Sequence, residues 1–165
     1  MATTCKLIQK IVLGSNAADI TFSDIPSTYT DLYIVASART TRNDAGVLAL
    51  RFNGSTTGYS NRFLEGNGSS AASYTDTDAI IVCGATSTSN TFGSVEIYIP
   101  NYAGSTNKSA SITSVQETNA SGAFIRAHAF LWSNTAAITS VKIQDNTSTN
   151  IVSGSAFFLY GITKA

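Results

Sequence analysis

Short runs of alternating apolar and polar residues follow one another along this chain, and clusters of turn-forming residues separate them. In the segment 93–99, every second residue from Val95 to Ile99 is β-branched and apolar, with Glu96 and Tyr98 between them. A period of two predicts a β-strand with one face on a core and the other on solvent or a partner. We therefore expect the side of this strand that carries Val95 and Ile99 to be buried.

The same pattern predicts eleven strands, at residues 7–13, 19–22, 31–39, 47–52, 62–65, 79–83, 93–99, 108–115, 124–132, 137–144 and 155–162. Asn53-Gly54 and Asn67-Gly68 are compact turn signals between them. No window keeps a helical apolar stripe together with good helix formers. The expected fold is an all-β, antiparallel β-sandwich that is jelly-roll-like. We expect one domain over residues 1–165, with residues 1–6 as a candidate N-terminal arm.

The glycine- and serine-rich stretch 66–73 reads as part of a long surface loop. We expect function to reside in such loops, at 40–46, 56–61, 66–77 and 85–90. Lys10, Lys108 and Lys142 fall within strands, where a lysine at an edge discourages pairing with other chains.

Charge narrows the classes of partner. Lys and Arg number ten, Asp and Glu also ten, and charged residues make up only 12% of the chain. Nucleic-acid binding requires a basic patch, so it is not expected. With no net charge to repel other copies, close self-association is tolerated. No apolar stretch approaches the ~20 residues of a membrane span, and the N-terminus carries no signal-peptide pattern.

Candidate chemistry is sparse. The single histidine, His128, falls in mid-strand, and neither Cys5 nor Cys83 stands in a recognisable nucleophile motif. The two cysteines match no metal motif and are expected to be unpaired. Asp76-Thr77-Asp78 offers alternate oxygens but lacks the rest of a calcium loop. We expect no catalytic residue, no metal and no cofactor, and hence a protein that is not an enzyme.

Aromatic residues are the remaining candidates for a binding site. Tyr59, Tyr74, Tyr102 and Trp132 could stack on the sugar rings of a glycan or contact a partner protein. The alternative is that most of these rings fill the core or a subunit interface.

Several segments taken together resemble a known family. They are Ile25-Pro26-Ser27-Thr28-Tyr29-Thr30-Asp31-Leu32, Leu50-Arg51-Phe52-Asn53-Gly54-Ser55, Ile99-Pro100-Asn101-Tyr102-Ala103-Gly104, Lys108-Ser109, the run from Leu131-Trp132-Ser133-Asn134 to Ser140, and Leu159-Tyr160-Gly161-Ile162. In their order and spacing the chain resembles the small jelly-roll virion structural proteins of tailed bacteriophages, especially those of cyanobacteria. The motifs read as scaffold, with Tyr29 over one end of the sandwich and the last strand beside the first.

The resemblance implies a non-enzymatic virion protein, made in the host cytoplasm and carried on the outer surface of the particle. Its members include head decorations, fibres and tail-associated proteins. Our leading hypothesis is a capsid decoration or cement protein bound to the major capsid protein. A capsid presents threefold positions, so a homotrimer is expected. The alternative is a tail-fibre or receptor-binding module that recognises a host cell-surface glycan.

Overall fold

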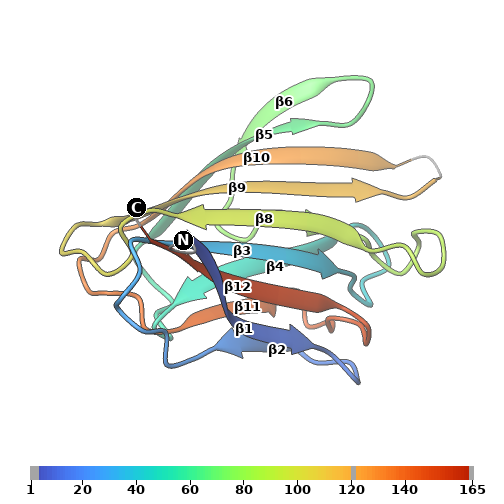
Figure 1. The fold of residues 1–165 in the computed structure, drawn as a ribbon. Coiled ribbons are helices and arrows are strands. Elements are labelled where there is room, and N and C mark those ends of the chain that lie inside the picture. The colour runs from blue at the N-terminus through green and yellow to red at the C-terminus, as the bar shows by residue number, and fades with distance from the viewer. Residues whose placement is uncertain (1–3, 120–121, 164–165) are drawn as a thin grey trace.

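Two antiparallel β-sheets pack face to face in the computed structural model, which describes residues 4–119 and 122–163 (Figure 1). The strands are β1 (Cys5–Val12), β2 (Asp19–Phe22), β3 (Asp31–Ala38), β4 (Gly46–Phe52), β5 (Tyr59–Gly66), β6 (Ala71–Thr75), β7 (Ile80–Val82), β8 (Gly93–Ile99), β9 (Lys108–Glu117), β10 (Ala123–Trp132), β11 (Val141–Asp145) and β12 (Ala156–Ile162). The described residues contain no helix. The all-β sandwich expected from the sequence is confirmed.

The strand order is that of a jelly roll with two additions. Eight strands pair as β1-β12-β3-β8 and β2-β11-β4-β7, and the chain crosses between these two sheets as a jelly roll requires. The hairpin β5–β6 is inserted between β4 and β7, and the hairpin β9–β10 between β8 and β11. Both hairpins extend the first sheet beyond β8, giving the order β1-β12-β3-β8-β9-β10-β5-β6. In Figure 1 the β5–β6 hairpin stands at the upper edge, clear of the small sheet.

The core lies between the sheets and follows the alternation of the sequence. In β8, Val95, Ile97 and Ile99 are buried, and Glu96 and Tyr98 point outward. At one end Phe52 of the small sheet meets Trp132 of the large sheet edge to face, with ring centroids 5.7 Å apart. The expected burial of the odd-numbered side of β8 is confirmed.

The first and last strands lie side by side, as the motif at the C-terminus predicted. Cys5 pairs with Ile162 and Lys6 with Gly161 at one end of β1. Cys5 and Lys6 were expected in an arm, but their backbones instead pair with β12. Residues 1–3 of that expected arm lie outside the described residues.

One strand was missed by the sequence reading. Residues 71–75 were assigned to a surface loop, but they form β6 and pair with β5. The Asn67 side-chain oxygen accepts hydrogen bonds from the N–H groups of Ser69 and Ser70, and Gly68 has φ of 85°, so the turn is tight. All residues of β6 are exposed. Without a buried side the segment lacks the apolar alternation by which the other strands were found.

Two of the family-like motifs have a direct structural explanation. A Cβ at Gly161 would lie 2.3 Å from the Tyr29 ring, so only glycine lets that ring cover the end of the sandwich. Asn53 and Gly54 both have positive φ, as a tight Asn-Gly turn requires. The Asn53 side chain accepts from the N–H of Thr139 and donates to the carbonyl of Ala137, which ties this turn to the connection after β10.

No helix that could span a membrane is found in the described part of the chain.

Candidate functional site

The four aromatic candidates do not form one exposed platform. Tyr102 and Trp132 are buried in the core, where no ligand can stack on their faces. Tyr59 stacks on Trp132, with ring centroids 6.1 Å apart and planes at 17°, and its hydroxyl accepts a hydrogen bond from the Phe52 N–H. For Tyr102 and Trp132 the core-filling alternative is therefore correct, and Tyr59 packs with them. Of the four, Tyr74 is the most exposed, at 49%, and its ring remains open to a ligand.

Tyr74 lines a cavity of about 640 Å³ that we call the hairpin cleft. The cleft lies on the inward side of the β5–β6 hairpin, and the loops that carry Arg42 and Asn146 border it. Its lining residues come from six parts of the chain and are Arg42, Val47, Phe63, Glu65, Tyr74, Thr75, Asp76, Asp78, Arg126, Asn146 and Thr147. Arg42 and residues 74–76 fall in the loop ranges where function was expected.

The floor of the cleft is an ordered ion pair over an aromatic ring. Arg126 of β10 and Glu65 of β5 face each other in the strand register, and Arg126 Nε and Nη2 both lie 2.6 Å from Glu65 Oε2. Arg126 Nη1 donates to the Ala79 carbonyl at 2.8 Å, and the guanidinium lies 4.7 Å from the centroid of the Phe63 ring. Three separate contacts therefore hold this arginine in one position.

The hairpin side of the cleft continues from the same ring. Phe63 is buried, and Tyr74 packs against it with ring centroids 5.5 Å apart and planes at 33°. The contact follows from the register, because Phe63 and Tyr74 are directly paired across β5 and β6. Tyr74 thus rests on a rigid base while half of its surface stays exposed.

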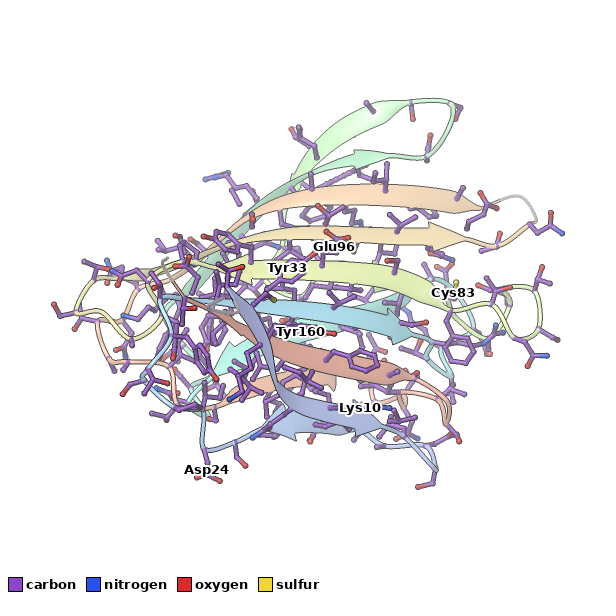
Figure 2. All side chains as sticks on the ribbon, viewed as in Figure 1. Lys10, Asp24, Tyr33, Cys83, Glu96 and Tyr160 are labelled. Carbon is purple, nitrogen blue, oxygen red and sulfur yellow. The ribbon has the colours of Figure 1, made fainter. Side chains whose placement is uncertain are left out.

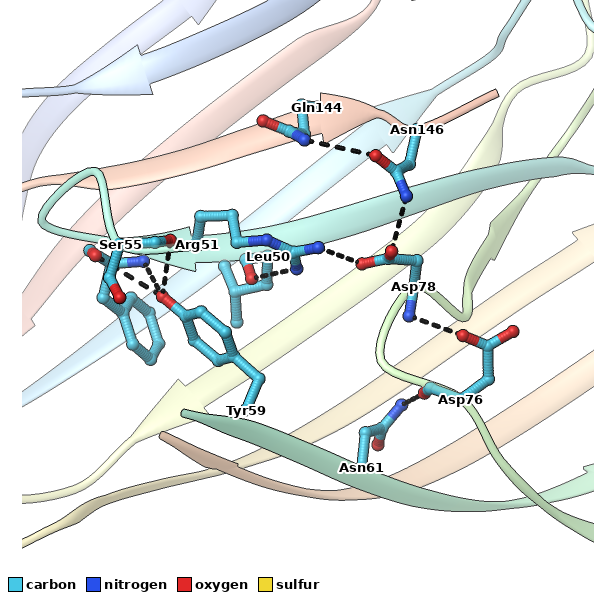
Figure 3. Close-up of polar contacts among 10 residues, drawn as sticks. Leu50, Arg51, Ser55, Tyr59, Asn61, Asp76, Asp78, Gln144 and Asn146 are labelled. Atoms are coloured by element: carbon cyan, nitrogen blue, oxygen red, sulfur yellow. Dashed lines mark hydrogen bonds and ion pairs between the residues drawn. The ribbon is translucent and has the colours of Figure 1, made fainter. Parts of the chain in front are cut away.

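A second ion pair, between Arg51 and the cleft residue Asp78, is drawn in Figure 3. Asp78 receives Arg51 Nη2 on one carboxylate oxygen and Asn146 Nδ2 on the other, both at 2.5 Å. The Asp78 N–H in turn donates to Asp76 Oδ1 at 3.0 Å. These bonds join β4, the loop before β7 and the loop after β11.

His128 lies beside Phe63, with ring centroids 5.1 Å apart, in a buried polar chain. Asn61 Nδ2 lies 3.2 Å from His128 Nδ1, and Ser114 Oγ lies 3.5 Å from Nε2. Since Asn61 Nδ2 can only donate, Nδ1 accepts and the ring proton resides on Nε2. Burial, and secondly the nearby Arg126, lower the pKa of His128 to about 4, so the ring is neutral at pH 7.

This chain of serine, histidine and asparagine has the residue types of a nucleophile site but lacks access for a substrate. Ser114 is fully buried, and its Oγ accepts a hydrogen bond from the Ile81 N–H. A nucleophile must reach a reacting carbonyl, and here its oxygen is enclosed between the sheets. In this position the three side chains join β5, β9 and β10 to β7.

The remaining candidates stand apart from the cleft. Cys5 is exposed and Cys83 is buried, and the two are unpaired. Burial raises the pKa of the Cys83 thiol, which makes it a poorer nucleophile. Among the described residues no three or more His, Cys, Asp or Glu side chains are grouped as metal ligands would be.

Sequence reasoning singled out Tyr74 and placed Arg42, Thr75 and Asp76 in candidate loops, but it assigned no role to Glu65, Arg126 or Asn146. Asp76-Thr77-Asp78 was the one signal noted there, as a weak calcium pattern. In the structure the two carboxylate oxygens of Asp78 instead accept hydrogen bonds from Arg51 and Asn146. No family model, no curated protein and no solved structure matches the chain.

Proposed function

We propose that the chain is a non-enzymatic structural protein of a bacteriophage virion, which decorates the outer surface of the head. The order of its motifs supports this proposal, since it resembles small virion proteins over nearly the whole chain. We further propose that it assembles as a homotrimer and binds the major capsid protein. The observation that carries the assembly is the outward face of the large sheet.

The outward side chains of β9, β10 and β5 are small, hydroxylated or apolar. We call this surface the docking face, and it consists of Ser109, Ser111, Thr113, Val115, Ile125, Ala127, Ala129, Leu131, Ser60, Arg62 and Leu64. Leu64 and Ile125 are more than half exposed, at 66% and 53%. A hollow of about 330 Å³ lies over this region, lined in part by Leu64 and Ala127. Arg62 is the only ionisable residue of this set, and Glu117 stands outward beside the set at the end of β9.

Such a face is suited to a second sheet. Small side chains permit the close approach of about 10 Å at which sheets stack. Exposed apolar side chains gain free energy when a partner covers them. Figure 2 looks onto the outward side of the same sheet, where Tyr33 and Tyr160 continue the surface toward β1 and Lys10 and Glu96 are its labelled charges. The occupant we assign to the docking face is a neighbouring copy of this chain, which in a threefold ring meets it with a different surface.

A charge placed at the centre of the docking face tests the assembly. Ala127 lies between Thr113 and Leu64 in the strand register. In an interface the carboxylate of Ala127→Glu would be buried, and the nearest cation, Arg62, stands opposite Ala129 and donates to Thr75, so we expect the trimer to dissociate to monomers. Sedimentation of the purified protein at micromolar concentration measures this. The matched control is Thr56→Glu in an exposed turn, which should remain trimeric.

A wild-type protein that sediments as a monomer would contradict the trimer, and so would a trimer that tolerates Ala127→Glu. Antibody-labelled electron microscopy of virions that carry the protein tests its location. Label on the head surface supports a decoration protein. Label on tail fibres would overturn that assignment in favour of the receptor-binding alternative.

A further inference from the structure

We infer that the hairpin cleft is a binding site for a short, uncharged glycan, with Tyr74 as the stacking residue and Asp76 and Arg42 as its hydrogen-bonding partners. This site lies on the opposite side of β5 and β10 from the docking face, because Glu65 and Arg126 point inward and Leu64 and Ala127 outward. Both surfaces could be occupied at once, and neither proposal depends on the other.

The β5–β6 hairpin that forms the cleft is an addition to the jelly roll and contributes few side chains to its core. Every residue of β6 is exposed, and Phe63 is the only large apolar side chain that β5 buries. A hairpin that buries so little gains little stability from its position. Its inward side nevertheless carries an aromatic pair and an ordered arginine. The cavity volume lies in the range of about 300–1,000 Å³ that is usual for ligand sites.

The charges around the cleft balance. Arg42, Arg126 and the Arg51 that pairs with Asp78 face three carboxylates, those of Glu65, Asp76 and Asp78. A phosphate or sulfate would meet these carboxylates at close range, and repulsion would oppose its binding. The balance therefore favours a ligand without net charge.

The cleft leaves both a hydrogen-bond donor and a hydrogen-bond acceptor without a partner among the described residues. Arg126 donates to Glu65, and Arg51 and Asn146 both donate to Asp78. By contrast, the guanidinium of Arg42 and the Oδ2 atom of Asp76 make no hydrogen bond or ion pair with other residues that the structure describes. The Arg42 guanidinium can only donate hydrogen bonds, and Asp76 Oδ2 can only accept them. A sugar hydroxyl donates and accepts at once, so neighbouring hydroxyls can satisfy both.

Tyr74 supplies the apolar part of recognition. Its ring packs on Phe63 while 49% of the side chain stays exposed, so a flat surface is held in place at the cleft. The C–H face of a pyranose stacks on such a ring. Asp76 is held beside it, because its Oδ1 accepts from the Asp78 N–H and its carbonyl accepts from Asn61 Nδ2 (Figure 3). An ordered aromatic ring beside fixed polar groups reduces the entropy cost of binding.

Calorimetric titration of the full chain tests the inference. The probes are neutral trisaccharides of glucose, galactose, mannose, rhamnose and N-acetylglucosamine, together with matched sugars that carry uronate, sialate or sulfate. We expect at least one neutral probe to bind with Kd of about 1 mM or tighter. Tyr74→Ala should weaken that binding by about tenfold, and Asp76→Asn should weaken it while keeping the turn intact.

The control variant is Tyr98→Ala, which removes an exposed tyrosine from the outward side of β8 and should leave the affinity unchanged. Circular dichroism of each variant confirms that it is folded. The inference is overturned if no neutral probe binds, if only charged probes bind, or if binding survives both cleft substitutions. Sedimentation reports separately on the docking face, so either proposal can fail alone.

Discussion

Two basic side chains, Lys108 and His128, lie in the interior and are accommodated in different ways. Lys108 is fully buried, and its Nζ donates to the carbonyls of Gly104, Thr106 and Thr135. Three donors on three acceptors satisfy the ammonium group without a carboxylate, although burial still lowers its pKa. The expectation that Lys108 guards a strand edge is therefore wrong. It holds together the loops that follow β8 and β10.

His128 is kept neutral, and this makes stability depend on pH. The pKa of a histidine in an unfolded chain is near 6.5, and in the folded protein it is about 4. Between these values the unfolded chain binds a proton that the folded protein does not. The free energy of unfolding should therefore fall as pH drops from about 6.5 to about 4, by up to about 3 kcal/mol.

Chemical denaturation of the wild type and of His128→Gln at pH 7, 5.5 and 4 checks this prediction. Carboxylates titrate in both proteins, so the difference between the two curves isolates the histidine. We expect the wild type to lose its advantage over the variant as the pH falls. Two parallel curves would show that His128 is not the group responsible.

At the scale of the element, alternation decides which side chains reach the core. Ile97 has no exposed surface and stands opposite Ile34 and Ile112 in the neighbouring strands. Ile97→Ala leaves a cavity there, and we expect it to lower the free energy of unfolding by about 2–5 kcal/mol. Glu96→Ala, one residue away on the outward side, should change it by less than about 0.5 kcal/mol. Equal effects from the two variants would contradict the assignment of faces.

At the scale of the molecule, the two ends of the described chain meet. β1 pairs with β12, and the Thr163 N–H donates to the Thr4 carbonyl at 2.9 Å. Joining these ends should therefore cost little, and the tight turn of the β5–β6 hairpin is a suitable place for new ends. A circular permutant with a linker of about six Gly and Ser residues, opened between Gly68 and Ser69, is expected to fold.

The far-ultraviolet circular dichroism of the permutant and the fluorescence of the buried Trp132 should match those of the parent chain. A second permutant, opened between Ala127 and His128, is the control. It cuts β10, which pairs with β5 and β9 on its two sides, and we expect it not to fold. A folded control, or an unfolded first permutant, would contradict this account of the architecture.

Local pattern by itself determined the class of fold and nearly all the strands. Alternation placed Val95 and Ile99 on the inward side of β8, and the segments 19–22 and 93–99 coincide with β2 and β8. These features are readable because the period of two is a property of neighbouring residues and is enforced wherever one side is buried. The strand β6 escaped because neither of its sides is buried.

Only the tertiary structure decided which residues share a surface. Trp132 and Tyr102 are aromatic as Tyr74 is, yet they are buried and Tyr74 is not. The hairpin cleft combines Arg42, Glu65 and Asn146, which are far apart in the chain. They meet because two inserted hairpins pair through β5 and β10 and carry the large sheet past the small one. Pairing between distant strands depends on register and sheet order, and no local periodicity encodes either of them.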